Sequence, residues 1–241
     1  MLNYVEYGKE NKYDDDIFFQ KYSQMSRSQQ GLAGAGEWET LRKLLPDFKD
    51  KRVLDLGCGY GWHCIYAMEH GASSVVGVDI SHKMLEVAKE KTHFPQVEYK
   101  CCAIEDVEFP EESFDVILSS LAFHYVADYE ILVKKIYRIL KSGGKLVFTV
   151  EHPVFTAYGT QDWYYNEKGE ILHFPVDNYY YEGKRTAVFL GEKVTKFHRT
   201  LTTYLNTLLS NGFIINHIVE PQPPEYMMDI PGMQDEMRLS L

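Results

Sequence analysis

Cysteine is scarce in this sequence, with four residues, Cys58, Cys64, Cys101 and Cys102, among 241. Their spacing contains no paired Cys-x-x-Cys motifs, which argues against the usual kind of structural zinc site. A protein of a reducing compartment is the simplest interpretation of so few cysteines. Only Cys58 lies inside a recognisable motif, and we interpret it there as a small space-filling residue rather than a reactive thiol.

Long apolar runs and an excess of basic residues are also missing. No apolar stretch reaches the about 20 residues that a membrane-spanning helix needs. The first residues, Met1-Leu2-Asn3-Tyr4, lack a signal-peptide pattern, so we expect a cytoplasmic address. The 25 Lys and Arg are outnumbered by 35 Asp and Glu, which gives a net charge of −10. Such a charge argues against a nucleic-acid partner.

A glycine-rich stretch, Val53-Leu54-Asp55-Leu56-Gly57-Cys58-Gly59-Tyr60-Gly61, stands out in what the sequence does contain. It predicts a buried parallel strand, a tight turn and the start of a helix. The dinucleotide fingerprint Gly-x-Gly-x-x-Gly would need a glycine at position 62, which is Trp62. The indole would obstruct the close helix–strand contact that this glycine permits. A nicotinamide-dependent oxidoreductase is therefore a disfavoured alternative.

This stretch resembles the first motif of class I S-adenosylmethionine-dependent methyltransferases. The resemblance covers about residues 53–150 and is nearest to the small-molecule branch that includes quinone-biosynthesis-type enzymes. It implies S-adenosylmethionine as cofactor and S-adenosylhomocysteine as its product. The implied fold is α/β and Rossmann-like, a doubly wound, seven-stranded, mainly parallel sheet with an antiparallel last strand.

Hydrophobic patterning divides the chain into the parts of one such domain. We expect strands at 53–56, 74–80, 97–102, 113–119, 145–150 and 213–219, and helices at 62–70, 82–91, 128–140 and 199–210. Residues 1–50 then form an N-terminal helical lid, 51–150 the cofactor-binding core, 151–198 an insertion, and 199–241 a C-terminal helix and strand. Asn166-Glu167-Lys168-Gly169 predicts a turn inside the insertion, followed by β-like runs at 186–190 and 193–198.

The resemblance assigns cofactor contacts to the ends of the predicted strands. Asp79 follows the second strand and is expected to accept hydrogen bonds from the ribose hydroxyls. Many relatives carry an acid for the adenine amine where this chain has Ala103, so the group that recognises the amine is left open between Glu105 and Asp106. The further expected contacts are Asp55, Gly57, Cys58 and Gly59 in the turn, Ile80, Met84 and Ile104 against the adenine, and Ser119 after the fourth strand.

The lid supplies Tyr22, Arg27 and Trp38 as residues able to close the site. Arg27 either pairs through its guanidinium with the methionine carboxylate of the cofactor or is an ordinary surface residue.

Histidines are the candidate bases. His124 follows the fourth predicted strand and His152 the fifth, and ligands of parallel sheets bind at such strand ends. We choose His124 first and His152 second, because a neutral imidazole assists methylation of a phenol. A packed or capping histidine is the structural alternative for each. No His-x-x-x-His pattern supports a metal site, so we expect none.

The acceptor is expected to be a small molecule that is apolar or aromatic. Residues 119–124 lack the Asn/Asp-Pro-Pro-Tyr pattern of amino methylation on nucleic-acid bases, and no Pro-Cys pair is present for cytosine methylation. Residues 151–198 are dense in aromatic side chains and predict a substrate cover, with a satellite core or a dimer contact as alternatives. Methyl transfer to O, N or C is the favoured function. A binding protein that holds S-adenosylmethionine without turnover is a second alternative, and the oligomeric state, monomer or homodimer, is left open.

Overall fold

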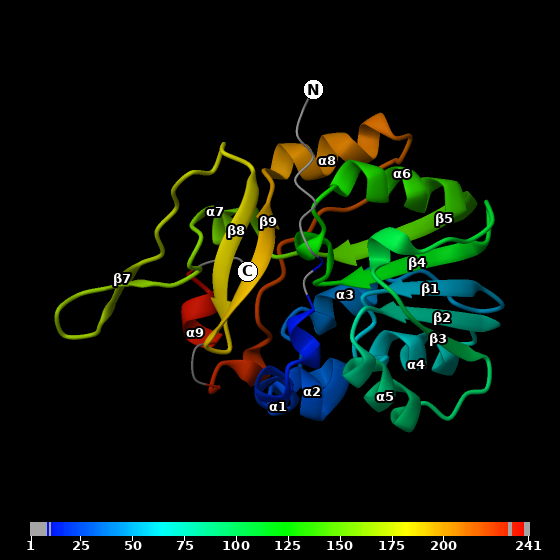
Figure 1. Cartoon of the computed structure of the whole chain (residues 1–241), viewed down its shortest axis with the longest axis horizontal. Helices are drawn as coiled ribbons and strands as arrows, with labels where there is room; N and C mark the ends of the chain where they lie inside the picture. The colour runs from blue at the N-terminus through cyan, green and yellow to red at the C-terminus, as the bar shows by residue number, and fades with distance from the viewer. Residues whose placement is uncertain (1–8, 10, 231–232, 239–241) are drawn as a thin grey trace.

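Five parallel strands form the central sheet of the computed structural model, which describes residues 9, 11–230 and 233–238 (Figure 1). The strands are β1 (Arg52–Leu56), β2 (Ser74–Asp79), β3 (Val97–Cys101), β4 (Phe114–Ser120) and β5 (Leu140–Thr149). They are ordered β3-β2-β1-β4-β5, so the direction of winding reverses between β1 and β4. This is the doubly wound α/β arrangement that the sequence predicts, and proteins with this arrangement bind ligands outside the strand ends at the reversal. The remaining parts of the expected lid and C-terminal region, residues 1–8, 10, 231–232 and 239–241, lie outside the described residues.

Helices cover both faces of the sheet because the strands are apolar on both sides. Leu54 and Leu56 face α6 (Tyr129–Ile139) and α8 (Leu201–Ser210) in one core cluster. Val53 and Val75 face the opposite way and pack with α4 (Trp62–Glu69) and α5 (His82–Lys91). The lid helix α3 (Trp38–Leu44) lies on this second face, where it packs against Tyr66 of α4 and Val147 of β5.

The four core helices begin and end close to the predicted positions. Three of them start at a side chain that accepts a hydrogen bond from the first turn: Ser81 before α5, Asp128 before α6 and Thr200 before α8. These caps satisfy backbone N–H groups that would otherwise lack partners. None of the helices in the described part of the chain combines the length and apolar composition needed to cross a membrane.

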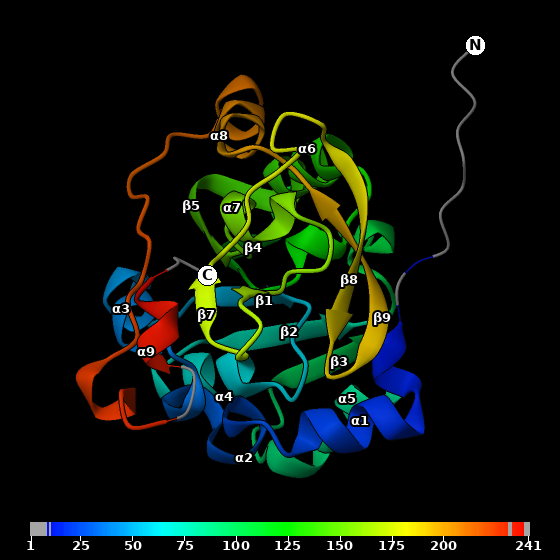
Figure 2. The same ribbon diagram turned by 90° about the vertical axis from the view of Figure 1, so that its left-hand side faces the viewer.

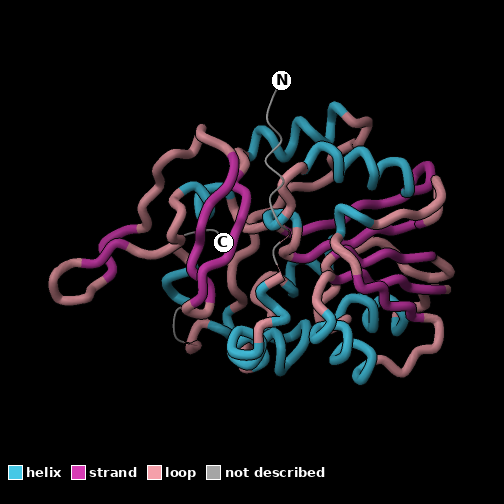
Figure 3. Tube along the Cα trace, in the orientation of Figure 1, coloured by secondary structure: helices cyan, strands magenta, loops and turns pink. Residues whose placement is uncertain are grey.

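The lid and the insertion meet at the carboxyl ends of the strands (Figure 2). The lid contains α1 (Asp16–Ser23), α2 (Ser26–Gln30), a 3₁₀ turn (Gly31–Gly34) and α3. The insertion contains α7 (Pro153–Ala157), the short pair β6 (Tyr164–Tyr165) and β7 (Ile171–His173), and the antiparallel hairpin β8 (Gly183–Phe189) and β9 (Glu192–His198). Figure 3 shows this hairpin as a separate pair of strands beside the central sheet. Phe18 of α1 packs against Ala187 and Val194 of the hairpin, so lid and insertion share a small core.

The expected seven strands are not all formed: the central sheet has five among the described residues. The segment 213–219, predicted as a strand, alternates only at its start, where Phe213 and Ile215 pack on the core while Ile214 is 85% exposed. Residues 216–219 are all exposed, and the segment makes no strand pairing; together with β5 it lines a cavity of about 1170 Å³. The apolar residues thus predicted a strand for which the described residues show no hydrogen-bonded neighbour. The short helix α9 (Met233–Glu236) follows this segment.

The fifth strand also begins earlier than predicted. β5 starts at Leu140, opposite Phe114, and includes residues 141–144, which lie between the predicted helix 128–140 and the predicted strand 145–150. The pairing register shifts between Phe114 and Val116, which accommodates this irregular start.

A substitution of Ile117 in β4 tests how much the buried side chains of the central sheet contribute to stability. Its side chain is 0% exposed, so Ile117→Ala should lower the free energy of unfolding by about 2–5 kcal/mol through lost burial and an unfilled cavity. Urea denaturation followed by circular dichroism would measure it. The matched control is Ile131→Ala on α6, where the side chain is 52% exposed and a change of less than about 1 kcal/mol is expected. Equal losses for the two variants would contradict this assignment of the core.

Candidate cofactor and active site

The glycine turn after β1 is fixed to the end of β2. The N–H groups of Gly57 and Cys58 both donate to the carbonyl oxygen of Val78, at 2.8 and 2.9 Å. Gly57 has a φ of 78° and Gly59 a φ of 52°, values that glycine adopts without strain. A Cβ added to Gly57 would lie 2.5 Å from the Cβ of Ala122, whereas one on Gly59 would meet no atom within 4 Å. The turn therefore exposes backbone at Gly59 to open space.

Asp79 lies beside this turn at the end of β2. Its Oδ2 accepts from the N–H of Gly59 and its Oδ1 from the N–H of Ser81, both at 2.9 Å. Burial raises the pKa of this carboxyl, and the two N–H donors oppose that rise. A carboxylate oxygen has two lone pairs, so each oxygen of Asp79 keeps one position for a further donor.

A cavity of about 270 Å³ is lined by Asp79 and by two groups of residues, which we call its two ends: one from α5 and the segment after β3, the other from the lid, the loop after β4 and the insertion. It brings together most of the residues that the sequence singled out: Tyr22, Arg27, Gly57, Gly59, Asp79, Ile80, Met84, Ala103, Ile104, Glu105 and His124. Met84, Ala103 and Ile104 are buried and give one end an apolar wall. Burial also raises the pKa of Glu105 at that end.

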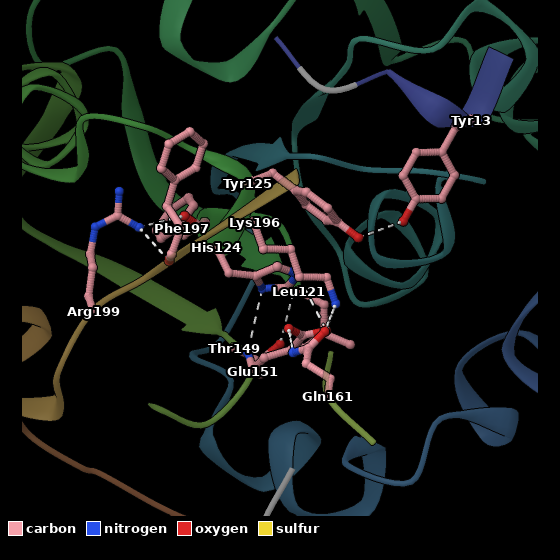
Figure 4. Close-up of polar contacts among 11 residues, drawn as sticks. Tyr13, Leu121, His124, Tyr125, Thr149, Glu151, Gln161, Lys196, Phe197 and Arg199 are labelled. Atoms are coloured by element: carbon pink, nitrogen blue, oxygen red, sulfur yellow. Dashed lines mark hydrogen bonds and ion pairs between the residues drawn. The ribbon is translucent and has the colours of Figure 1, made fainter. Parts of the chain in front are cut away.

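The other end of the cavity is lined by groups from the lid, from the loop after β4 and from the insertion (Figure 4). The hydroxyls of Tyr13 and Tyr125 lie 3.3 Å apart, and Phe189 of β8 forms part of the same wall. His124 is 2% exposed, and burial lowers its pKa to about 4, so its imidazole is neutral at pH 7. Its Nδ1 accepts from the N–H of Glu151 at 3.4 Å.

Glu151 is the acidic group at this end. Burial would raise its pKa, but interactions with His124 and Lys196 and a hydrogen bond from Gln161 together lower it. Lys196 of β9, 3% exposed, pairs with Oε1, while Gln161 donates to Oε2 at 2.8 Å. The carboxylate and the ammonium compensate each other, so this end carries no net charge.

The N-terminal segment is anchored beside Asp79. The hydroxyl of Ser81 donates to Oδ1 of Asp14 at 2.6 Å, and the N–H of Lys83 donates to the same oxygen at 3.2 Å. Asp14 is the neighbour of Tyr13, so one short stretch of the lid is bonded beside Asp79 and also lines the cavity.

Comparisons with known proteins agree with this geometry. The Methyltransferase domain family matches residues 54–148. A crystal structure from Listeria monocytogenes, provisionally assigned as an S-adenosylmethionine-dependent methyltransferase, is 56% identical with a TM-score of 0.84 and covers 88% of this chain and 95% of that one. An S-adenosylmethionine-dependent methyltransferase from Mesorhizobium loti is 39% identical with a TM-score of 0.79, covering 86% and 95% of the two chains. The chain belongs to the S-adenosylmethionine-dependent methyltransferases.

A partial relative is the ubiquinone biosynthesis O-methyltransferase of Coxiella burnetii, which is 36% identical over 112 residues. The match covers 46% of this methyltransferase and 47% of that protein, so the chain spans about half the length of this relative. Family membership sets aside the nicotinamide-dependent alternative, which Trp62 already disfavoured.

The residues of this methyltransferase fit an adenosyl cofactor. The open space over Gly59 admits a ligand next to the backbone, and the remaining acceptor positions of Asp79 suit two ribose hydroxyls. Ile80, Met84 and Ile104 provide apolar surface for a base. When bound, S-adenosylmethionine supplies a methyl group already activated on a sulfonium, so the protein has mainly to position the two reactants.

Several expected site residues lie outside the 270 Å³ cavity. Asp55 is buried, accepts from the Sγ of Cys64 at 3.4 Å, and burial raises its pKa to about 7. Ser119 is also buried and donates to the carbonyl of Leu56 at 2.7 Å, while its neighbour Ser120 lines the cavity instead. Cys58 lines a smaller adjoining cavity and is buried, which raises the pKa of its thiol and agrees with a space-filling role.

The structure also separates His152 from His124. Side chains alternate along the extended chain after β5, so Glu151 points into the cavity and His152 points away. Nδ1 of His152 accepts from the N–H of Val154, capping α7, and its Nε2 lies 2.7 Å from Glu220. The second-choice base is therefore a helix cap beside the cavity at β5.

The sequence analysis did not single out Tyr13, Tyr125, Glu151 or Phe189. Tyr125 and Glu151 are adjacent to residues that it did choose, so the strand-end rule located the right loops but not the right side chains. Tyr13 and Phe189 reach the cavity only because lid and hairpin fold over it, and no local pattern carries that information.

Asp79 is the cofactor contact that mutation tests most directly. Asp79→Asn removes the charged acceptor, and the affinity for S-adenosylhomocysteine should fall about 10- to 100-fold, the range of a lost charged hydrogen bond. Isothermal titration calorimetry would measure it. Asp115→Asn is the control, because Asp115 accepts from the N–H of Arg52 at 2.9 Å and does not line the cavity. Unchanged affinity in Asp79→Asn would place the ribose elsewhere.

His124 predicts a specific pH dependence of stability. Its pKa is about 4 in the folded protein against 6.5 for an ordinary histidine, so between these values the unfolded chain binds more protons. Stability conferred by this neutral, buried ring is complete above pH 6.5 and is lost as the pH falls towards 4, at no more than about 1.4 kcal/mol per pH unit. His124→Gln should remove this contribution. Urea unfolding of both proteins at several pH values from 7 to 4.5 gives the difference, in which titrating groups distant from His124 cancel; parallel curves would contradict the assignment.

Proposed function

We propose that this methyltransferase transfers the methyl group of S-adenosylmethionine to an O, N or C atom of a small, apolar or aromatic acceptor. The observation that supports the proposal is the composition of one end of the cavity. Aromatic side chains from three separate elements, Tyr13, Tyr125 and Phe189, line it together with Glu151, whose charge is compensated by Lys196. Pockets for small molecules are commonly lined in this way, with an apolar wall and a few polar groups that fix orientation.

Tyr13, Tyr125 and Phe189 form the apolar part of this end. An aromatic acceptor packed between them gains from burial and from ring contacts, whose geometry orients it. Glu151 and Lys196 compensate each other's charge. A neutral acceptor is therefore favoured over an ion, because the charge of an ion would be buried without a partner.

The hairpin β8–β9 is proposed as a cover that keeps water from the reacting atoms. Phe189 reaches the cavity from β8, and the guanidinium of Arg199, just after β9, donates to the carbonyl of Ala127 at 3.0 Å. This contact ties the hairpin to the loop that carries His124. The other aromatics of the insertion have a different place: Phe155, Trp163 and Phe174 pack on one another in a separate cluster. The predicted cover and the alternative satellite core thus fall on different parts of the insertion.

His124 is the group proposed to assist the acceptor. It is neutral at pH 7, and with a pKa of about 4 it is a weak base. We propose that the acceptor's hydroxyl or amine replaces the long 3.4 Å contact between Nδ1 of His124 and the N–H of Glu151, and that Nδ1 takes the proton only as the bond to the methyl carbon forms, while Nε2 keeps its hydrogen. The Glu151 carboxylate, with Oε1 3.8 Å from Nε2 of His124, is placed to stabilise the imidazolium that results.

The Coxiella burnetii relative supports an aromatic acceptor only indirectly. Its name assigns it to O-methylation in ubiquinone biosynthesis, and its similarity to this chain extends over 112 residues. The acceptor end depends in addition on Tyr13 and Phe189, which belong to the lid and the insertion.

The proposal is tested by screening acceptors. Purified protein with S-adenosylmethionine would be offered phenols, catechols, aromatic amines, aliphatic amines and carboxylic acids, with methylated products detected by mass spectrometry. We expect products from the neutral aromatic compounds. With a phenol so identified, His124→Ala should lower kcat more than tenfold and leave the affinity for S-adenosylhomocysteine unchanged.

His152→Asn is the matched control for this experiment, because asparagine is itself a good N-cap and His152 lies outside the cavity. It should keep normal turnover. Methylation confined to charged aliphatic compounds would overturn the proposed acceptor class, and near-normal turnover in His124→Ala would remove His124 from the chemistry.

A further inference from the structure

A second, smaller cavity of about 80 Å³ adjoins the first one on the lid side. The two share Tyr22, Arg27, Gly57, Gly59 and Ser120 along their border. The smaller cavity continues between Glu37 and Trp38 of the lid and Trp62 and His63 in the first turn of α4. A ligand whose ribose lies at Asp79 therefore has a path past the glycine turn into this space.

Two charged side chains of opposite sign stand in the wall of the small cavity. Nη2 of Arg27 donates to both carboxylate oxygens of Glu37, each at 3.0 Å. The pair is well shielded, with the side chains 27% and 15% exposed. Burial would lower the pKa of Arg27, but the charge of Glu37 and its hydrogen bond raise it. Each group thus depends on the other for compensation.

The remaining polar groups of this wall are neutral. Burial lowers the pKa of His63 to about 4, so Arg27 and Glu37 are the only lining residues that are charged at pH 7. Trp62 contributes a buried Nε1 that has no hydrogen-bond partner among the described residues. The cavity wall therefore presents one cation and one anion among neutral groups.

We infer that Arg27 and Glu37 form a joint subsite for the amino-acid end of the cofactor, in which Glu37 binds the α-ammonium and Arg27 the α-carboxylate. That end is a zwitterion with both charges on one carbon, and a wall with one charge of each sign matches it. Binding adds no net charge, so both side chains stay compensated. Arg27 alone would supply no charged partner for the ammonium.

Arg27 and Glu37 can bind the amino-acid end of the cofactor while the hydrogen bonds between their own side chains remain. The bonds to Glu37 use Nη2 of Arg27, and the guanidinium fork has further donors on Nη1 and Nε for a carboxylate. The carboxylate oxygens of Glu37 each have a second lone pair for an ammonium. The inference concerns only the cofactor end and does not depend on the proposed acceptor.

Calorimetric titration with two ligands tests the subsite. S-Adenosylhomocysteine carries the amino-acid end, and 5′-methylthioadenosine has the same adenosine and thioether without it. Glu37→Gln and Arg27→Gln should each weaken S-adenosylhomocysteine binding at least tenfold and change 5′-methylthioadenosine binding less than twofold. Glu39→Gln is the matched control: Glu39 forms an ion pair with Arg42 on the same helix outside the cavity, and its loss should alter neither affinity.

Two analogues of S-adenosylhomocysteine assign the partners separately. The wild-type protein should bind the decarboxylated and the deaminated analogue less tightly than the parent. Arg27→Gln should no longer distinguish the parent from the decarboxylated analogue, and Glu37→Gln should no longer distinguish it from the deaminated one. Because the wild-type measurements need no variant, they remain decisive if a variant fails to fold.

Four results would overturn the inference. Equal losses for S-adenosylhomocysteine and 5′-methylthioadenosine in the variants would mean that the ion pair only shapes the lid. Unchanged S-adenosylhomocysteine affinity would mean that the cavity does not hold the amino-acid end, as would wild-type protein that binds all three homocysteine ligands equally. If instead Arg27→Gln no longer distinguished the parent from the deaminated analogue, and Glu37→Gln no longer distinguished it from the decarboxylated one, the assigned roles of the two residues would be wrong.

Discussion

The hydrogen bonds between the glycine turn and the end of β2 are the constraint on which the rest of the site depends. They hold Gly57 and Cys58 against Val78, and Gly59 against the carboxylate of Asp79. Asp79 also accepts from the N–H of Ser81, whose side chain caps α5 and bonds the lid through Asp14. One carboxylate thus connects the central sheet, the start of a helix and the N-terminal segment. Because its position fixes all three, the two cavities take their shape from the strand ends and not from the loops alone.

Each of the two cavities has a shielded ion pair in or beside its wall. A charge removed from water needs a partner close by, and each cavity provides one within its own wall. Lys196 compensates Glu151 at the acceptor end, which leaves that end neutral towards what enters it. Arg27 compensates Glu37 at the lid, but there both members of the pair line the cavity themselves. A neutral histidine accompanies each pair, His124 in the first case and His63 in the second.

Much of the core fold could be predicted because its signals are local. The run from Val53 to Gly61 specifies a strand, a turn and a helix within a few residues, and Ser81 marks the start of the next helix. Asp79 could be chosen because the rule for parallel sheets concerns strand ends, which the sequence shows directly. The cofactor class followed from the same stretch, through its resemblance to a known family.

The rest depends on long-range contacts that a linear pattern does not contain. Segment 213–219 begins with the alternation of a strand, but a strand also needs a hydrogen-bonded neighbour, and among the described residues it pairs with none. His152 and Ser119 were one residue away from side chains that do face the cavity, since alternation reverses direction at each step. Tyr13, Glu37 and Phe189 lie in elements that meet only after the lid and the hairpin have packed on the strand ends.

The adjacency of Tyr13 and Asp14 has a consequence for how the lid is held. Asp14 is bonded beside Asp79, and Tyr13 meets Tyr125 where the acceptor is proposed to lie. A peptide bond joins the two residues, so one short stretch of the lid is held at two points of the site. The loop after β4 and the start of α5, far apart in the sequence, are thereby bridged by two consecutive side chains.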